Sequence, residues 1–179
     1  MSAPVWHLLS EASKPVQVSV TREAFRDAMA LVGAAVHVVT TDGPAGRAGF
    51  TASAVCSLSD TPPMVLVCLN RQTSVHAAFE RNGVLCVNTM GATHEALAAL
   101  FGGRTPMESR FAAAGWAIGA TGAPRLLDAL VSLDCRVLRT AREATHDVFF
   151  CEVVELAAHE PAPPLIYQGR RFHALPAAC

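Results

Sequence analysis

The sequence predicts a β-dominated α+β fold, a closed β-barrel interrupted by a few short helices. Short β-branched and apolar runs recur along most of the chain and are separated by turn residues. Short turns such as DGPAGRAG, residues 42–49, are typical of connections between antiparallel strands. No G-x-G-x-x-G motif follows the first predicted strand, which argues against a doubly wound dinucleotide-binding fold.

The chain length of 179 residues suits a single domain. Residues 1–20 contain two prolines and no clear period, so we expect a flexible N-terminal arm followed by one domain over residues 21–175. Hydrophobic residues make up 51% of the chain and supply ample material for a core. The formal net charge of −1 gives no electrostatic footprint for nucleic acid or anionic lipid.

The first third of the domain is predicted to hold a helix and a hairpin. Thr21 is a suitable N-cap for a helix that runs through Met29. The β-branched run VHVVTT, residues 36–41, indicates a strand, and FTASAVCSLS, residues 50–59, indicates a second strand beyond the turn.

Strands and short helices alternate in the middle of the chain. The predicted strands are MVLVCLN, residues 64–70, and GVLCVNTM, residues 83–90. A helix over residues 74–82 is expected to be capped by Ser74, and a second helix over residues 94–102 ends at glycine. A further helical turn is expected within ESRFAAAGW.

The last third is predicted to be almost entirely strand. The segment ALVSLDCRVLRTAREATHDVFFCEVVELAAHE indicates two long strands joined near residues 142–145. A proline-rich turn then leads to a final strand, LIYQGRRFHAL.

Several common classes of protein are disfavoured by what the sequence lacks. No C-x-x-C, H-x-H or H-E-x-x-H spacing is present, so we expect no metal site. No G-x-S-x-G elbow, P-loop or kinase motif occurs. The uncharged segment from Ala28 to Thr41 is shorter than a membrane span, and no secretory signal is visible, so a soluble, cytoplasmic protein is expected. Four cysteines in β-rich apolar runs are expected in the core: Cys56, Cys68, Cys86 and Cys151.

Small hydroxyl residues are concentrated in TASAVCSLSDT. On one continuous strand, Thr51, Ser53 and Ser57 would point to the same side, with Ser59 beyond them. Such small side chains let a flat conjugated ring approach the backbone, whose N–H and C=O groups pair with its heteroatoms. An ordinary exposed strand face is the alternative.

A second polar cluster, CLNRQTSVHAAF, precedes a predicted helix. Asn70, Arg71, Thr73 and Ser74 bring hydroxyls, a cation and free N–H groups together, a combination that suits a phosphate. An ordinary N-cap beside a solvated arginine explains the segment equally well when it is taken alone.

Together these segments belong to a longer pattern, GRAGFTASAVCSLSDTPPMVLVCLNRQTSVHAAFERNGVLCVNTM, continued by LFGGRTPMESRFAAAGW, THDVFFCEV and YQGRRFHAL. This pattern resembles the flavin reductase family, whose members bind FMN in a split β-barrel. The resemblance covers roughly residues 21–175 and is strongest to members that act in pyrimidine (uracil) utilisation.

The resemblance implies a set of flavin-binding residues. It places the first three residues of TASAVCS along the isoalloxazine ring with a serine nearby, and three residues of NRQTS near the ribityl phosphate. A looser candidate, an arginine after the short helix, would contact an anionic group or else be solvated. The implied residues are Thr51, Ala52, Ser53, Ser57, Asn70, Thr73, Ser74 and Arg104.

Many relatives carry G-D-H in the loop that faces the nicotinamide, whereas this chain has Thr145, His146 and Asp147. His146 and Asp147 are therefore expected to be a charged pair near the flavin, with a hairpin-corner role for the histidine as the alternative. Asn88 matches the V-N segment of the family and is equally well explained as a structural residue that bonds local backbone. Three further residues could line a neighbouring subunit's site or pair with surface carboxylates: Tyr167, Arg170 and Arg171.

The activity implied by the resemblance is NADH-dependent reduction of FMN, with reduced flavin released to a partner monooxygenase of pyrimidine degradation. FAD or riboflavin as substrate and NADPH as donor remain open. The alternatives are a reductase for another two-component monooxygenase, such as one acting on 4-hydroxyphenylacetate, and a non-catalytic flavin-binding module. A homodimer is expected.

Overall fold

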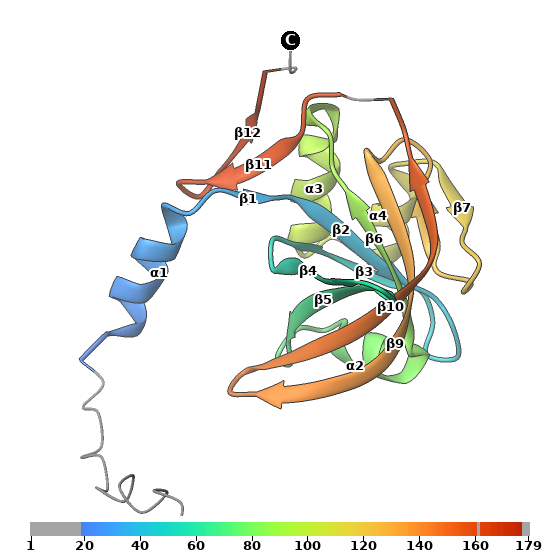
Figure 1. The fold of residues 1–179 in the computed structure, drawn as a ribbon. Helices are drawn as coiled ribbons and strands as arrows, with labels where there is room; N and C mark the ends of the chain where they lie inside the picture. The colour runs from blue at the N-terminus through green and yellow to red at the C-terminus, as the bar shows by residue number, and fades with distance from the viewer. Residues whose placement is uncertain (1–18, 161, 177–179) are drawn as a thin grey trace, which may run out of the picture.

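A computed structural model describes residues 19–160 and 162–176 (Figure 1). The predicted N-terminal arm, residues 1–20, lies outside the described residues except for its last two positions. Most of the molecule is one antiparallel sheet of seven strands in the order β3-β2-β6-β9-β10-β5-β4. Its strands are β2 (His37–Thr41), β3 (Ala48–Ala52), β4 (Val55–Asp60), β5 (Pro63–Asn70), β6 (Val84–Thr89), β9 (Val131–Glu143) and β10 (His146–Ala158).

The strand order makes this sheet an open barrel. β3 and β4 lie at opposite edges of the sheet, yet only Ser53 and Ala54 separate them in the chain. The two edges must therefore come close together, which curls the sheet, and Cys68 N on β5 donates to Ala54 O at 3.0 Å. The predicted barrel is confirmed, and it is split between β3 and β4.

The same break corrects one prediction. The segment 50–59 is not one strand, because β3 pairs with β2 whereas β4 pairs with β5. A register shift between Ser57 and Ser59 interrupts β4 as well. The period-two pattern of hydroxyl residues therefore does not form one continuous face.

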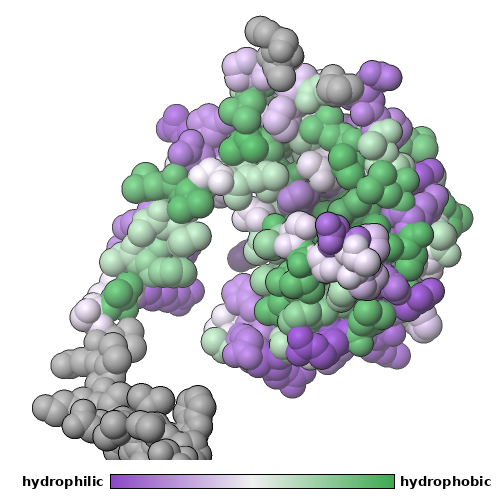
Figure 2. Space-filling model, viewed as in Figure 1, coloured by the Kyte–Doolittle hydropathy of each residue, from purple (hydrophilic) through white to green (hydrophobic). Residues whose placement is uncertain are grey.

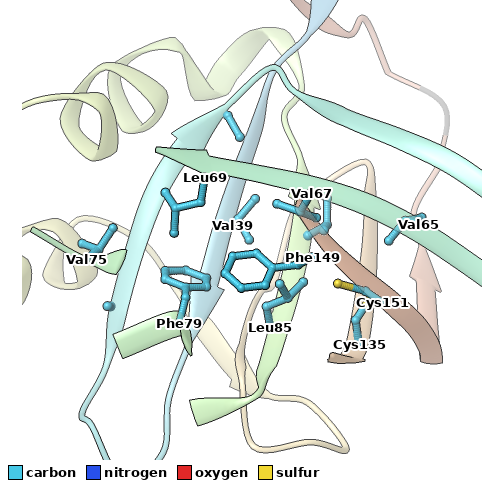
Figure 3. Packing of buried hydrophobic residues seen from close by; sticks show 13 residues of the cluster. Val39, Val65, Val67, Leu69, Val75, Phe79, Leu85, Cys135, Phe149 and Cys151 are labelled. Atoms are coloured by element: carbon cyan, nitrogen blue, oxygen red, sulfur yellow. The ribbon is translucent and has the colours of Figure 1, made fainter. Parts of the chain in front are cut away.

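Apolar side chains from the strands and from α2 (His76–Asn82) fill the barrel. Val39, Val67, Leu85, Phe79 and Phe149 are all at most 1% exposed and converge at its centre (Figure 3). Packing of this kind excludes water from the interior, so any ligand site must lie outside the barrel core.

A second apolar cluster lies under α3 (Glu95–Gly102) and α4 (Met107–Ala112). The rings of Phe101, Phe111 and Trp116 contact one another with centroids 5.0–5.7 Å apart. Both predicted helices are confirmed. A short 3₁₀ helix, Ala92–His94, precedes α3, and the hairpin β7 (Trp116–Ile118) and β8 (Pro124–Leu126) follows α4.

The helix predicted to begin at Ser74 begins two residues later. α2 has Val75 as its N-cap with no side-chain cap hydrogen bond, and it has only seven residues. The preceding turn is closed locally instead, because Thr73 Oγ1 donates to Asn70 O at 2.9 Å and His76 N donates to Thr73 O. Ser74 is thereby left outside the helix.

A three-stranded sheet joins the two ends of the described chain. It consists of β1 (Ala34–Ala35), β11 (Leu165–Gln168) and β12 (Arg171–Ala174). The predicted single strand over residues 165–175 is a hairpin, since Gly169 and Arg170 both have positive φ angles, 58° and 61°, and reverse the chain.

Helix α1 (Arg22–Ala30) extends from this small sheet and stands away from the barrel (Figure 1). Thr21 caps it as predicted, accepting a hydrogen bond from Ala24 N at 3.1 Å. None of its residues is buried. Among the described residues, no helix is both long and apolar enough to cross a bilayer.

The prediction that four cysteines lie in the core is only partly confirmed. Cys86 and Cys151 are buried as expected, and burial raises the pKa of Cys151 to about 12, so its thiol stays protonated. Cys68 is only partly buried. Cys56 is exposed, contrary to the prediction, because β4 is an edge strand of the sheet.

Candidate functional site

Two cavities lie along β3. The first, which we call the ring-sized cavity, has a volume of about 380 Å³. It is lined by three adjacent residues at the end of the strand, Thr51, Ala52 and Ser53. Small residues of α3 form another wall, and the β11–β12 hairpin forms a third. The further lining residues are Val36, Ala98, Ala99, Gly102, Tyr167, Arg170 and Phe172. Walls built from alanine, glycine and serine leave space for a flat ring close to the backbone.

Thr51 fixes the wall of this cavity. Its Oγ1 donates a hydrogen bond to Ala98 O at 2.6 Å, which joins the end of β3 to helix α3. The Thr51 hydroxyl therefore has no hydrogen left to donate to a ligand. Ser53 is exposed and has no such partner among the described hydrogen bonds, so its hydroxyl and the strand backbone are the groups that can pair with a ligand.

The second cavity, of about 480 Å³, lies at the start of the same strand and is basic. Its charged lining consists of three arginines and no carboxylate, and its other polar lining includes Ser74. The lining residues are Ala45, Arg47, Ala48, Ser74, Val75, Ala78, Gly103, Arg104, Thr105, Pro106, Met107 and Arg110. Positive charge without an acidic partner favours an anionic ligand.

The two cavities are linked by β3 and by the end of α3. Ala48 lines the basic cavity, and Ala52, four residues further along the strand, lines the other. That separation is roughly 14 Å at the rise of an antiparallel strand. Gly102 and Gly103 likewise line one cavity each. An elongated ligand with a flat ring at one end and an anionic group at the other matches this arrangement.

The structure brings together only some of the residues predicted to contact a phosphate. Ser74 and Arg104, distant in sequence, line the same basic cavity. Asn70 and Thr73 line neither cavity and are engaged in their own turn, where Asn70 Oδ1 accepts from Gln72 N at 2.9 Å. Ser57 is exposed on β4 and lines neither cavity.

The predicted charged pair of His146 and Asp147 is wrong. The two residues are adjacent on β10, so their side chains point to opposite faces; His146 is exposed and Asp147 is fully buried. The partner of Asp147 is His76 of α2, with Nε2 and Oδ2 2.8 Å apart. Arg71 and Arg142 approach the same carboxylate from outside, each at 3.5 Å.

Burial acts to raise the pKa of Asp147, but the hydrogen bond to His76 and the guanidinium groups of Arg142 and Arg71 outweigh it and hold the pKa below its ordinary value. The residue is therefore a buried carboxylate that stays ionised and joins α2 to β10. His76 was not anticipated, because nothing in the sequence near residue 76 indicates a partner 71 positions away.

Two arginines of the basic cavity were also not anticipated. Arg47 lies over the ring of Phe111 at 4.6 Å, and Arg110 is buried beneath the loop that follows α3. For Arg110, the one available sequence signal was a charged residue beside the apolar run in ESRFAAAGW. The sequence gives no indication of the backbone that surrounds it.

The remaining candidates are placed as follows. The structure supports the structural alternative for Asn88, since its Oδ1 accepts from Leu126 N at 2.8 Å inside the core. Arg170 lines the ring-sized cavity of its own chain and forms an ion pair with Asp27 of α1. Tyr167 lines that cavity too, whereas Arg171 lines neither cavity.

Comparison with known proteins identifies similar chains. The sequence model of one protein family, described as the flavin reductase like domain, matches residues 29–176 of this chain. A relative from Ancylobacter novellus, named FMN reductase (NADH) RutF, is 58% identical over 174 residues, which cover 97% of this chain and 95% of the relative.

Solved structures show the same similarity. A putative flavin reductase from Haemophilus somnus is 40% identical with a TM-score of 0.85, covering 87% of this chain and 100% of that one. BorF, the flavin reductase component of a bacterial two-component tryptophan halogenase, is 28% identical with a TM-score of 0.82 and covers 88% of this chain and 100% of its own.

Proposed function

Because the chain belongs to the flavin reductase-like domain family, we propose that it is an NADH-dependent FMN reductase. The observation that carries the proposal is the pair of cavities along β3, one walled by small residues and the other by arginines without a carboxylate. A ring, a flexible linker and a phosphate are the three parts of FMN in that order.

The residues present fit FMN at both ends of the strand. The isoalloxazine ring would lie beside Thr51, Ala52 and Ser53, where the backbone and the Ser53 hydroxyl supply hydrogen-bonding groups. The phosphate would be bound by the Ser74 hydroxyl and the Arg104 guanidinium, which line the basic cavity. Side chains, rather than the terminus of the short helix α2, are the donors in this proposal.

When the flavin and NADH are bound, they supply the chemistry themselves, a hydride passing from nicotinamide C4 to flavin N5. The protein then needs no nucleophile or metal, which agrees with the absence of a hydrolase motif in the sequence. Its residues would bind and orient the two rings, since hydride transfer requires the reacting atoms to be about 3–3.5 Å apart. His146, exposed at the start of β10, stays a predicted nicotinamide contact.

The experiment is a titration of the purified protein with FMN, FAD and riboflavin, following the oxidation of NADH and of NADPH with each flavin. We expect flavin-dependent NADH oxidation with the highest kcat/KM for FMN. A protein that binds FMN without oxidising either nicotinamide would instead be a flavin-binding module, and the reductase proposal would be wrong.

We propose that the product, reduced FMN, is released to a monooxygenase. BorF, the flavin reductase component of a two-component halogenase, supports a reductase that works beside a second enzyme. We propose a pyrimidine-degrading monooxygenase as that enzyme, because the sequence motifs most resemble flavin reductases of pyrimidine utilisation. Reduced FMN made by this protein should support uracil oxidation by that partner in a reconstituted mixture. A cytoplasmic location stays a prediction that cell fractionation tests.

We also propose a homodimer in which α1 is covered by the second copy. The helix and the segment after it expose apolar side chains that the described chain does not cover: Phe25, Met29, Leu31 and Val32 are 49–73% exposed. In Figure 2 this apolar surface lies on a helix separated from the barrel by open space. A helix with no buried side chain gains little from its own chain, and a subunit interface supplies the missing contacts.

A further inference from the structure

Arg110, on α4, is buried against the loop that carries Arg104. It is 7% exposed, and its three side-chain hydrogen bonds within the described chain all go to backbone carbonyl groups in or next to that loop. Its Nε donates to Thr105 O at 2.7 Å, its Nη1 to Phe101 O at 3.0 Å and its Nη2 to Gly103 O at 2.8 Å.

These three carbonyls follow one another along the chain from the last turn of α3 to the start of α4. Phe101 lies in the final turn of α3, and Gly103 is its C-cap. The carbonyl groups at a helix C-terminus have no partner within the helix and favour a cation, so Arg110 satisfies them. Arg104 lies between two of the bonded residues, Gly103 and Thr105.

The charge of Arg110 has no carboxylate partner among the described residues. Burying a cation without a carboxylate is costly, and three carbonyl hydrogen bonds compensate part of that cost. Arg47, Arg104 and Arg110 therefore concentrate positive charge around a space that holds no acidic side chain. An anion that entered the cavity would complement this charge.

We propose that Arg110 is a positioning residue that fixes residues 103–105, so that Arg104 is held in the basic cavity with Ser74 before any ligand arrives. The inference rests on the proposed FMN reductase function. It adds that phosphate binding depends on a buried guanidinium that acts through Arg104. A lysine cannot replace it, because one ammonium group does not reproduce the planar fork that reaches three carbonyls at once.

The test compares Arg110→Lys with the unaltered protein by two readouts. Hydrogen–deuterium exchange of the ligand-free protein reports on the loop, and quenching of flavin fluorescence gives the Kd for FMN and for riboflavin. We expect faster exchange of the amides at residues 103–105, a Kd for FMN raised by roughly tenfold, and a Kd for riboflavin changed by less than about twofold.

Leu126→Ala is the matched control, because Leu126 is fully buried in the same apolar cluster as α3 and α4 but lines neither cavity. It should lower the Tm without changing the ratio of the two Kd values. Arg104→Ala supplies the second half of a double-mutant cycle. If Arg110 acts through Arg104, the double variant Arg104→Ala/Arg110→Lys should have the same ratio of the Kd for FMN to the Kd for riboflavin as Arg104→Ala alone.

Two results would overturn the inference: unchanged exchange of residues 103–105 in Arg110→Lys, or effects of the two substitutions on the Kd ratio that simply add. Failure of the proposed phosphate site has a different signature. In that case Arg104→Ala would weaken FMN and riboflavin equally, whatever the exchange of the loop shows.

Discussion

Ser74 is the residue whose side chain distinguishes a phosphate site from a general flavin surface. Its hydroxyl lines the basic cavity and lies outside α2. We expect Ser74→Ala to raise the Kd for FMN roughly tenfold, since a hydrogen bond to a charged group is worth about 1.5–3 kcal/mol, and to leave riboflavin nearly unchanged. Ser57→Ala, an exposed hydroxyl outside both cavities, is the control. Equal losses for both flavins would remove Ser74 from the phosphate site.

His37 makes the stability of the fold sensitive to acid. Burial lowers its pKa from 6.5 to about 4, so between these values the unfolded chain binds a proton that the folded chain does not. The free energy of unfolding should therefore fall as the pH drops from 6.5 to 4, by about 3 kcal/mol in total. Above pH 6.5 the residue adds no pH dependence.

The measurement is urea unfolding of the unaltered protein and of His37→Gln at pH 7 and pH 5. Glutamine can retain a hydrogen bond to Thr89, whose Oγ1 lies 3.1 Å from His37 Nδ1, but it does not titrate in this range. The variant should lose less stability between the two pH values than the unaltered protein. The same loss in both proteins would mean that another group is responsible.

At the scale of elements, the close approach of β3 to α3 positions the wall of the ring-sized cavity. A Cβ added at Gly49 would lie 2.7 Å from Phe101 Cε1 and 3.2 Å from Val39 O. Gly49→Ala must therefore displace the Phe101 ring, which is packed in the apolar cluster under α3, and we expect a loss of about 1–3 kcal/mol in urea unfolding. In Gly102→Ala the nearest atom is 3.7 Å away, so stability should be preserved. Equal stability of both variants would contradict this packing.

Most elements could be predicted from local pattern, because helices and strands follow from hydrophobic periodicity and turn residues. The break after Ala52 could not, since the hydroxyl pattern continues through residues that pair with different neighbours at opposite edges of the sheet. Ser74 and Arg104 were found as separate candidates. Arg110 and His76 were missed, because their partners are carbonyls and a carboxylate that only the folded chain brings to them.

At the scale of the whole molecule, the exposed face of α1 predicts an obligatory partner for that helix. Phe25 is 58% exposed on α1, and Phe25→Glu should therefore convert a dimer into monomers, as measured by light scattering. Ile118→Glu, at a side chain that is 83% exposed on β7, is the control and should leave the mass unchanged. A monomeric unaltered protein would contradict the proposed homodimer.

The proposed activity requires that one FMN molecule occupies both cavities. A crystal structure of the protein with FMN tests this arrangement directly. The ring should lie beside Ala52 and Ser53, with the phosphate between Ser74 and Arg104. Electron density for FMN at any other place, or for a ring at Ala52 whose phosphate points away from the arginines, would contradict the account.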